Sequence, residues 1–93
     1  MQLYAIRRRN GWKTTKELEA TVGKSIEVGN GEMSDRVRWI RSYVLKETDG
    51  TLGMICIYEA RDAASIDEHA KRVGIPADGI NPIVNTVVVR PDP

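Results

Sequence analysis

The chain has 93 residues, of which 41% are hydrophobic and 29% are charged. A chain of this length supports one hydrophobic core and not two, so we expect a single domain spanning residues 1–93, with the composition of a folded globular protein. Fourteen basic and thirteen acidic residues leave a net charge of +1. This charge supplies no long-range field for nucleic acid or anionic membranes, so we expect neither as a partner.

A strand and a helix are predicted first. Residues 3–8 carry apolar side chains on both alternating faces, and a turn at residues 10–11 follows them. Thr14 and Glu17 have the spacing of a capping box, which predicts a helix that ends near residues 30–31. The apolar stripe of this helix consists of Leu18, Val22, Ile26 and Gly29.

Two strands joined by a hairpin come next. Residues 37–46 and 52–60 are rich in β-branched and aromatic side chains and flank an Asp-Gly turn at residues 49–50. With a two-residue turn, Tyr43 lies opposite Cys56. One face of the hairpin then carries an aromatic set with a thiol, namely Trp39, Arg41, Tyr43, Met54, Cys56 and Tyr58. The other face carries an aliphatic set with a serine, namely Ile40, Ser42, Val44, Ile55 and Ile57.

A second helix and a last strand complete the pattern. The helix begins after Asp62 and ends at the Gly-Ile-Pro sequence of residues 74–76. The valine-rich residues 83–90, closed by Pro91, predict the last strand. The order strand, helix, strand, strand, helix, strand predicts the α+β ferredoxin-like fold, a four-stranded antiparallel sheet with both helices on one face.

The predicted sheet is apolar on both faces, whereas a sheet covered by helices on one face is normally polar on the other. A second copy of the chain is the available cover. We therefore expect a homodimer whose interface is mainly the aliphatic sheet face.

A few local sequence features predict the cellular compartment and one basic surface cluster. No apolar stretch approaches the roughly 20 residues that cross a bilayer, and no signal peptide is recognised at the amino end. The single Cys56 lies in an apolar run, where a buried reduced thiol is expected, so we predict a cytoplasmic protein. The three arginines at residues 7–9 form a basic cluster that we expect to be solvated.

The candidate functional pocket lies between the sheet and the second helix. Helical spacing from Ile66 and Val73 turns His69 toward the aromatic face, where its imidazole is a candidate acid, base or metal ligand, or a structural histidine. Tyr43 and Tyr58 are candidate catalytic residues that orient a substrate oxygen, or they pack in the core. The remaining predicted pocket-lining residues are Trp39, Met54 and Cys56.

The metal-binding potential of the chain rests on His69 and Cys56. One histidine and one cysteine make a poor nitrogen and sulfur site in a single chain, so oxygen ligands or a second subunit must complete it. The same two residues are also a candidate thiolate and imidazolium pair, although a lone cysteine in a central strand is more often an inert small hydrophobe.

Three segments, WIRSYV, ICIYEARD and IDEHAKRVGIPAD, resemble a small bacterial family of domains of unknown function that includes a nickel-responsive, nickel-binding protein. The resemblance covers nearly the whole chain. It implies a ferredoxin-like domain that pairs through its sheet into a dimeric α+β barrel, with nickel as the bound metal. Other dimeric barrels of this shape imply two alternatives by analogy of fold. These are a cofactor-independent isomerase, cyclase or monooxygenase-like enzyme with His69 as acid or base, and a non-catalytic module that binds a small ligand.

Overall fold

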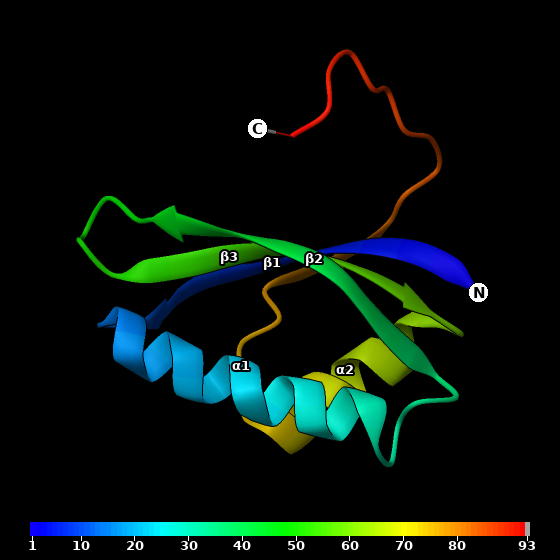
Figure 1. The fold of residues 1–93 in the computed structure, drawn as a ribbon, viewed down its shortest axis with the longest axis horizontal. Coiled ribbons are helices and arrows are strands. Elements are labelled where there is room, and N and C mark those ends of the chain that lie inside the picture. Colours follow the sequence, from blue (N-terminus) through cyan, green and yellow to red (C-terminus); the bar gives the residue numbers. More distant parts are fainter. Residues whose placement is uncertain (93) are drawn as a thin grey trace.

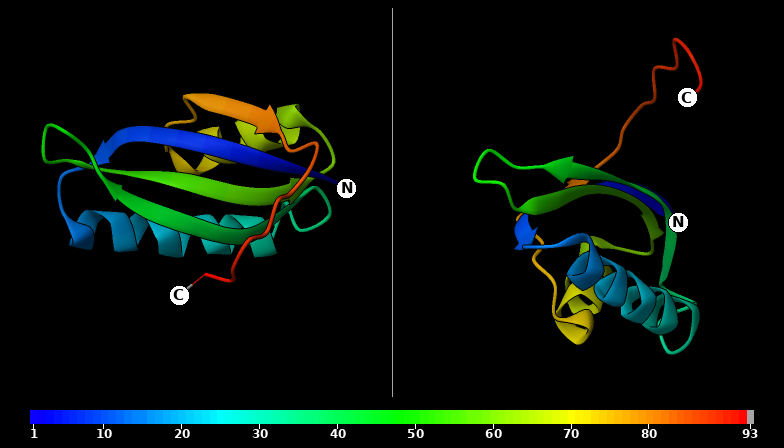
Figure 2. Two further views of the ribbon diagram at one scale, coloured as in Figure 1. Left: turned by 90° about the horizontal axis from the view of Figure 1, so that it is seen from above. Right: turned by 60° about the vertical axis from the view of Figure 1, so that its left-hand side comes forward.

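Two layers make up the protein, a four-stranded antiparallel sheet and a pair of helices on one of its faces (Figure 1). The computed structural model describes residues 1–92. In chain order the elements are β1 (Gln2–Trp12), α1 (Thr15–Asn30), β2 (Val37–Lys46), β3 (Leu52–Ala60), α2 (Ala63–Val73) and β4 (Gly79–Pro82). The strand order β2-β3-β1-β4 places β1 and β3 at the centre of the sheet, which confirms the predicted ferredoxin-like α+β fold (Figure 2). Neither helix of the described chain is long and apolar enough to cross a membrane.

Local sequence explains where both helices begin and end. The Thr14 hydroxyl accepts a hydrogen bond of 3.2 Å from the Glu17 amide at the start of α1, and the Asp62 carboxylate caps α2 through a bond of 2.8 Å. At the end of α2, Gly74 adopts a left-handed conformation with φ of 82°, which glycine tolerates without a steric penalty. The predicted caps and helix stop are therefore confirmed.

The core lies between the sheet and the helices, and alternate residues of the two central strands enter it. Tyr4, Ile6 and Arg8 of β1 point inward in turn, because successive side chains of a strand alternate between faces. Buried residues that pack with them include Met54, Cys56 and Tyr58 of β3, Leu18 of α1 and Ile66 of α2.

The hairpin between β2 and β3 differs from the prediction by one residue of register. Glu47 and Thr51 pair around a three-residue loop in which Gly50 has φ of 87°, whereas the prediction used a two-residue turn. Ser42 therefore lies opposite Cys56, and Tyr43 lies opposite Ile55 on the other face. A one-residue shift moves every side chain of a strand to the other face.

A bulge within β2 restores the predicted orientation at one end of this strand. Trp39 pairs with Tyr58 and Arg41 pairs with Ile57, so Ile40 is the additional residue on β2. As a result Trp39 faces the helices as predicted, although Tyr43 does not.

Both terminal strands have bounds that differ from those predicted. The first strand extends to Trp12, and the predicted turn at residues 10–11 is an irregular stretch within it, where Asn10 has φ of 50°. The last strand is β4, not residues 83–90, because pairing beside β1 places Ile80 opposite the buried Ile6. Beyond β4, residues 84–92 belong to no strand and extend over the sheet face that carries no helix (Figures 1 and 2).

Candidate functional site

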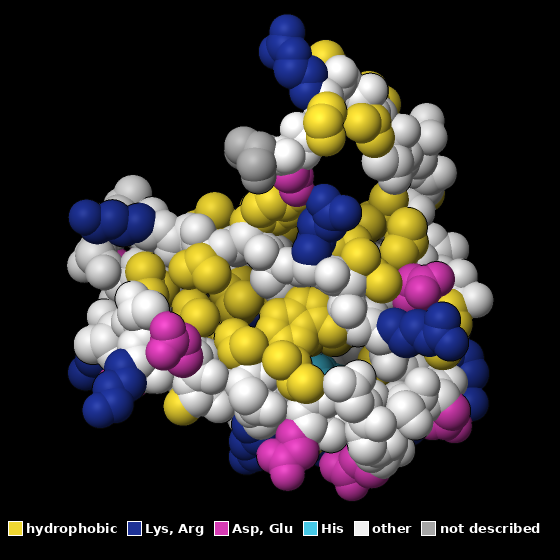
Figure 3. Space-filling model, in the orientation of Figure 1, with side chains coloured by type: hydrophobic (Ala, Val, Ile, Leu, Met, Phe, Trp, Pro, Cys, Tyr) yellow, Lys and Arg dark blue, Asp and Glu magenta, His cyan; other side chains and the backbone are white. Residues whose placement is uncertain are grey.

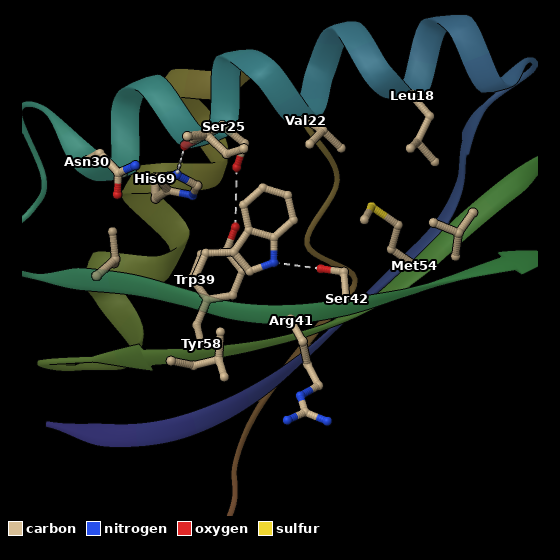
Figure 4. A pocket seen from close by; sticks show the side chains of 15 residues that line it. Leu18, Val22, Ser25, Asn30, Trp39, Arg41, Ser42, Met54, Tyr58 and His69 are labelled. Atoms are coloured by element: carbon tan, nitrogen blue, oxygen red, sulfur yellow. Dashed lines mark hydrogen bonds between the residues drawn. The ribbon is translucent and has the colours of Figure 1, made fainter. Parts of the chain in front are cut away.

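A cavity of about 480 Å³ lies between α1 and β2 and reaches inward to the strand β3 and the helix α2 (Figure 4). Figure 3 shows hydrophobic side chains gathered around this hollow, with the side chain of the one histidine visible inside it. Its walls include Leu18, Val22, Ser25 and Asn30 from α1, Trp39, Ser42 and Val44 from β2, Met54 and Tyr58 from β3, and His69 from α2. The volume is in the range of small-molecule sites.

His69 forms the inner polar wall of the cavity. Its side chain is 1% exposed, and its Nε2 lies 3.2 Å from the carbonyl oxygen of Ser25 on α1. A carbonyl oxygen only accepts, so Nε2 carries the proton, and Nδ1 of the neutral ring is an acceptor. Within residues 1–92 this Nδ1 has no hydrogen-bond partner. Burial, assisted by the charge of Arg8, lowers the pKa of His69, which favours this neutral ring.

Tyr58 supports His69 from the centre of the sheet. The two rings meet edge to face with centroids 5.5 Å apart, and the Tyr58 hydroxyl lies 3.3 Å from the Ser25 hydroxyl. Burial raises the pKa of Tyr58, so its hydroxyl stays protonated at neutral pH. Ser25 therefore contacts both residues, through its carbonyl and its hydroxyl, and fixes their positions relative to α1.

Trp39 forms part of the cavity wall and covers Tyr58 of β3. Its ring stacks on Tyr58 with centroids 6.0 Å apart and an interplanar angle of 14°. The indole nitrogen donates a hydrogen bond of 2.7 Å to the Ser42 hydroxyl, which holds the ring against the cavity wall (Figure 4). The ring of Trp39 therefore covers the buried Tyr58 and gives the cavity a flat apolar wall.

Arg8 lies behind this wall, in the core, although it was predicted to be solvated with its neighbours. It is 1% exposed, donates from Nε to the Cys56 sulfur at 3.4 Å, and donates from Nη1 to the Pro76 carbonyl at 2.7 Å. The guanidinium carbon is 5.8 Å from the centre of the Tyr58 ring, as in a cation–π contact. Its Nη2 has no partner within the described chain. Among residues 1–92, no carboxylate accepts a hydrogen bond from Arg8, and both groups that do accept one, the Cys56 sulfur and the Pro76 carbonyl, are neutral.

The structure separates the predicted pocket residues into three groups. Trp39, Met54, Tyr58 and His69 line the cavity. Cys56 faces the same side of the sheet but lies deeper, beside Arg8, where a second cavity has only about 10 Å³. The placement of Tyr43 was wrong, since the changed register turns it to the helix-free face, where it is 42% exposed and bonds Asp92.

The helix α1 supplies much of the cavity wall, whereas the prediction placed the pocket beneath the second helix. Leu18, Val22 and Ile26 belong to the apolar stripe already visible in the sequence, and all three line the cavity. Strand alternation from Tyr4 and Ile6 was a signal that would have placed Arg8 inside. No pattern in the sequence singles out Ser25 or Ser42, whose roles depend on tertiary contacts.

A metal ion would find few donors here. Among residues 1–92, no group of three or more histidine, cysteine, aspartate or glutamate side chains is arranged to hold one. The Nδ1 atom of His69 suits a borderline metal such as nickel, because it is a neutral nitrogen with no proton to displace. Cys56 suits it poorly, since the Arg8 guanidinium beside the sulfur repels a divalent cation.

The fold and the cavity define a small ferredoxin-like α+β protein with a ligand-sized site between its sheet and its helices. The chain belongs to the family of nickel-responsive proteins described as SCO4226-like, whose family model matches residues 4–83. This match confirms the resemblance inferred from the sequence.

A solved structure has the same fold. The crystal structure of SCO4226 from Streptomyces coelicolor A3(2) superposes with a TM-score of 0.72 at 17% identity, covering 91% of this chain and 99% of that chain. At this identity the similarity establishes the fold alone. A search of curated proteins finds no match to the chain.

Proposed function

We propose that this protein is a small metal-responsive protein whose binding site is the cavity between α1 and β2, with His69 as its polar anchor. The single observation that carries the proposal is the Nδ1 atom of His69, a buried acceptor without a partner among residues 1–92, on a residue that lines a 480 Å³ cavity. A buried polar atom without a partner is costly, so a bound species that contacts Nδ1 is favoured.

Nickel is the first candidate for that species. Family membership supports it, and a neutral imidazole is a nickel ligand. Sequence reasoning named His69 and Cys56 as ligands. The Arg8 guanidinium at the sulfur disfavours Cys56, whereas His69 offers an unprotonated Nδ1, so the remaining positions fall to oxygen ligands, a bound small molecule or a second subunit.

Nickel titration of three proteins by calorimetry tests this assignment. The wild-type protein is expected to bind, His69→Gln to lose at least about tenfold in affinity, and Cys56→Ser to bind as the wild type does. Both replacements are close in volume to the original residue, so thermal unfolding without metal serves as the folding control. Nickel affinity unchanged in folded His69→Gln would contradict the assignment.

A small organic ligand is the second candidate, favoured by the apolar walls and the flat ring of Trp39. A planar ligand would stack there and donate a hydrogen bond to the imidazole. For an enzymatic role we propose His69 as the base and Tyr58 as a neutral hydroxyl near it, whereas Tyr43 lies on the other face.

Thermal stabilisation by aromatic and lactone-like compounds, measured without metal, separates this candidate from the first. We expect stabilising compounds to lose their effect in Trp39→Ala and His69→Gln. If none of these compounds stabilises the wild type while nickel still binds, the small organic ligand is contradicted and nickel remains as the candidate.

We also propose that the protein is a homodimer joined through the helix-free sheet face. Ile55 and Ile57 lie on this face as predicted, but Ile40, Ser42 and Val44 do not. Their cross-strand neighbours on this face are Arg7 and Ala5 of β1 and Arg41 and Tyr43 of β2. An obligate interface buries about 2,000 Å² or more in total, so sedimentation at micromolar concentration should show a dimer, and a compact monomer would contradict it.

A further inference from the structure

The last ten described residues carry a strand-forming sequence that has no strand partner. Beyond Ile83, whose amide donates to the Leu3 carbonyl at 2.9 Å, the chain leaves the sheet and arches over its helix-free face (Figures 1 and 2). Four valines on this segment are 94%, 83%, 74% and 82% exposed, in the order Val84, Val87, Val88 and Val89. Valine is enriched in strands and is normally buried, so this exposure is unusual.

The arch does not pack on the sheet of its own chain. Asp92 bonds Arg41 at 2.8 Å and also bonds Tyr43, and these contacts hold the C-terminal end of the arch to β2. Between the arch and the sheet remains a space of about 540 Å³, and the residues that line it are Arg41, Tyr43, Thr86, Val87, Val88, Arg90, Pro91 and Asp92. The exposed valines therefore gain no cover from the sheet below them.

An edge strand of matching length is available on the same molecule. β2 pairs only with β3 and leaves the backbone groups of its other edge without a strand partner among residues 1–92. It has 10 residues, as many as the segment from Ile83 to Asp92. At about 3.3 Å per residue, ten extended residues span roughly 33 Å, close to the 35 Å longest extent of the molecule. The other edge strand, β4, has 4 residues and ends at Pro82, which lacks an amide hydrogen.

We propose that residues 83–92 form an exchanged arm, which adds as a strand to the β2 edge of a second copy of this chain. The inference rests on the proposed sheet-to-sheet dimer. A partner sheet packed on the helix-free face would occupy the space beneath the arch, since packed sheets lie about 10 Å apart. The arm then passes the partner sheet and reaches its edge. Twofold symmetry makes the exchange reciprocal, so each copy gives one arm and accepts another.

The decisive experiment determines which chain the arm contacts. Protein of natural isotope composition and ¹⁵N-labelled protein, each with a photo-crosslinking amino acid at position 88, are unfolded, mixed in equal amounts, refolded and irradiated. Mass spectrometry of peptides joining the arm to β2 is expected to show both isotopes in about half of them, because random pairing of copies mixes the labels. The exchange is overturned if both peptides of every crosslinked pair carry the same isotope, or if no crosslink to β2 forms.

A matched pair of variants tests whether the arm stabilises the dimer. Val87→Asp with Val89→Asp should raise the dimer dissociation constant at least about tenfold, whereas Asp92→Ala, which removes only the contacts of the arm with its own β2, should leave it near the wild-type value. Equal dissociation constants for the double variant and the wild type overturn the exchange. A monomeric wild type overturns both the exchange and the dimer, while a dimer without mixed crosslinks overturns the exchange alone.

Discussion

At the scale of single residues, His69 makes the stability of the protein depend on pH. Because burial lowers its pKa in the folded state, the folded protein favours the neutral ring. The stabilisation is fully present above the unfolded pKa of about 6.5 and is lost as the pH falls through the lowered folded value. The carboxylates with lowered pKa values, such as Glu47 and Asp62, titrate at lower pH than this window.

The measurement is urea unfolding at about pH 7.5 and about pH 5.5. We expect the wild-type protein to lose stability between these values and His69→Gln to lose clearly less, since glutamine does not titrate. Equal losses in both proteins would show that His69 is not the group responsible.

Arg8 is a second residue whose burial has a measurable effect. Its charge contributes to the lowered pKa of His69, so Arg8→Met should raise that pKa toward the ordinary value, as followed by NMR titration of the imidazole. The exposed Arg9→Met is the matched control and should leave the pKa unchanged. A pKa that does not move in Arg8→Met would show that burial alone accounts for the shift.

The stability of Arg8→Met is expected within about 1.5 kcal/mol of the wild type, because an apolar residue of similar length replaces a buried charge that has no carboxylate partner within the described chain. Arg8→Ala removes packing as well and should cost more. Urea unfolding of the two variants checks this order.

At the scale of elements, Gly53 is the position where β1 and β3 leave no room for a side chain. A β-carbon there would lie 2.6 Å from Glu47 Oε2, 2.7 Å from the Arg8 carbonyl and 2.9 Å from Arg7 Nη1. Gly53→Ala should therefore destabilise the protein by about 1–3 kcal/mol, as for other overpacked sites.

The same substitution in α1 provides the control for Gly53→Ala. A β-carbon on Gly23 meets nothing within 4 Å, and the residue lies inside the helix. Gly23→Ala should stabilise the protein by about 0.5–1 kcal/mol, because glycine is a poor helix former. The free energy of unfolding of both variants is measured by chemical denaturation. A change in the same direction for Gly53→Ala and Gly23→Ala would contradict this account.

The elements also show how far sequence reasoning extends. Helix caps and strand periodicity are local, so the ends of α2 and the bounds of β2 and β3 were predicted correctly. The loop at Gly50 and the bulge at Ile40 depend on backbone geometry that composition does not specify, and the register that the loop sets is the reason why Tyr43 was misplaced. The valines of residues 83–90 have high strand propensity, yet β4 forms earlier because Ile80 there meets the core.

At the scale of the whole molecule, the cavity connects α1 and β2, two elements that flank its opening. A bound species that contacts His69 and Trp39 would restrain both of them at once. Hydrogen exchange with nickel or an organic ligand bound should therefore slow most at the amides of α1 and β2, and least at β4 on the far edge of the sheet. Protection spread evenly over all strands would instead indicate that the ligand acts on global stability.

The candidate site follows from the same long-range arrangement. His69 was predicted because the helical spacing of α2 is regular and one histidine is easy to recognise. Ser25, which holds both His69 and Tyr58, is 44 residues from His69 in the sequence. Only the packing of α1 against α2 and the sheet brings them together, so no local pattern predicts their contact.

The positions of the two tryptophans give the protein an internal optical reporter. Trp12 is 6% exposed and its indole donates to the Thr21 hydroxyl at 2.9 Å, whereas Trp39 lines the cavity. Indole emission depends on the polarity and the quenchers around the ring. In Trp12→Phe, all tryptophan fluorescence would originate from the wall of the candidate site. Its quenching by a paramagnetic ion, or its blue shift on entry of an apolar ligand, would report occupancy directly, without a label.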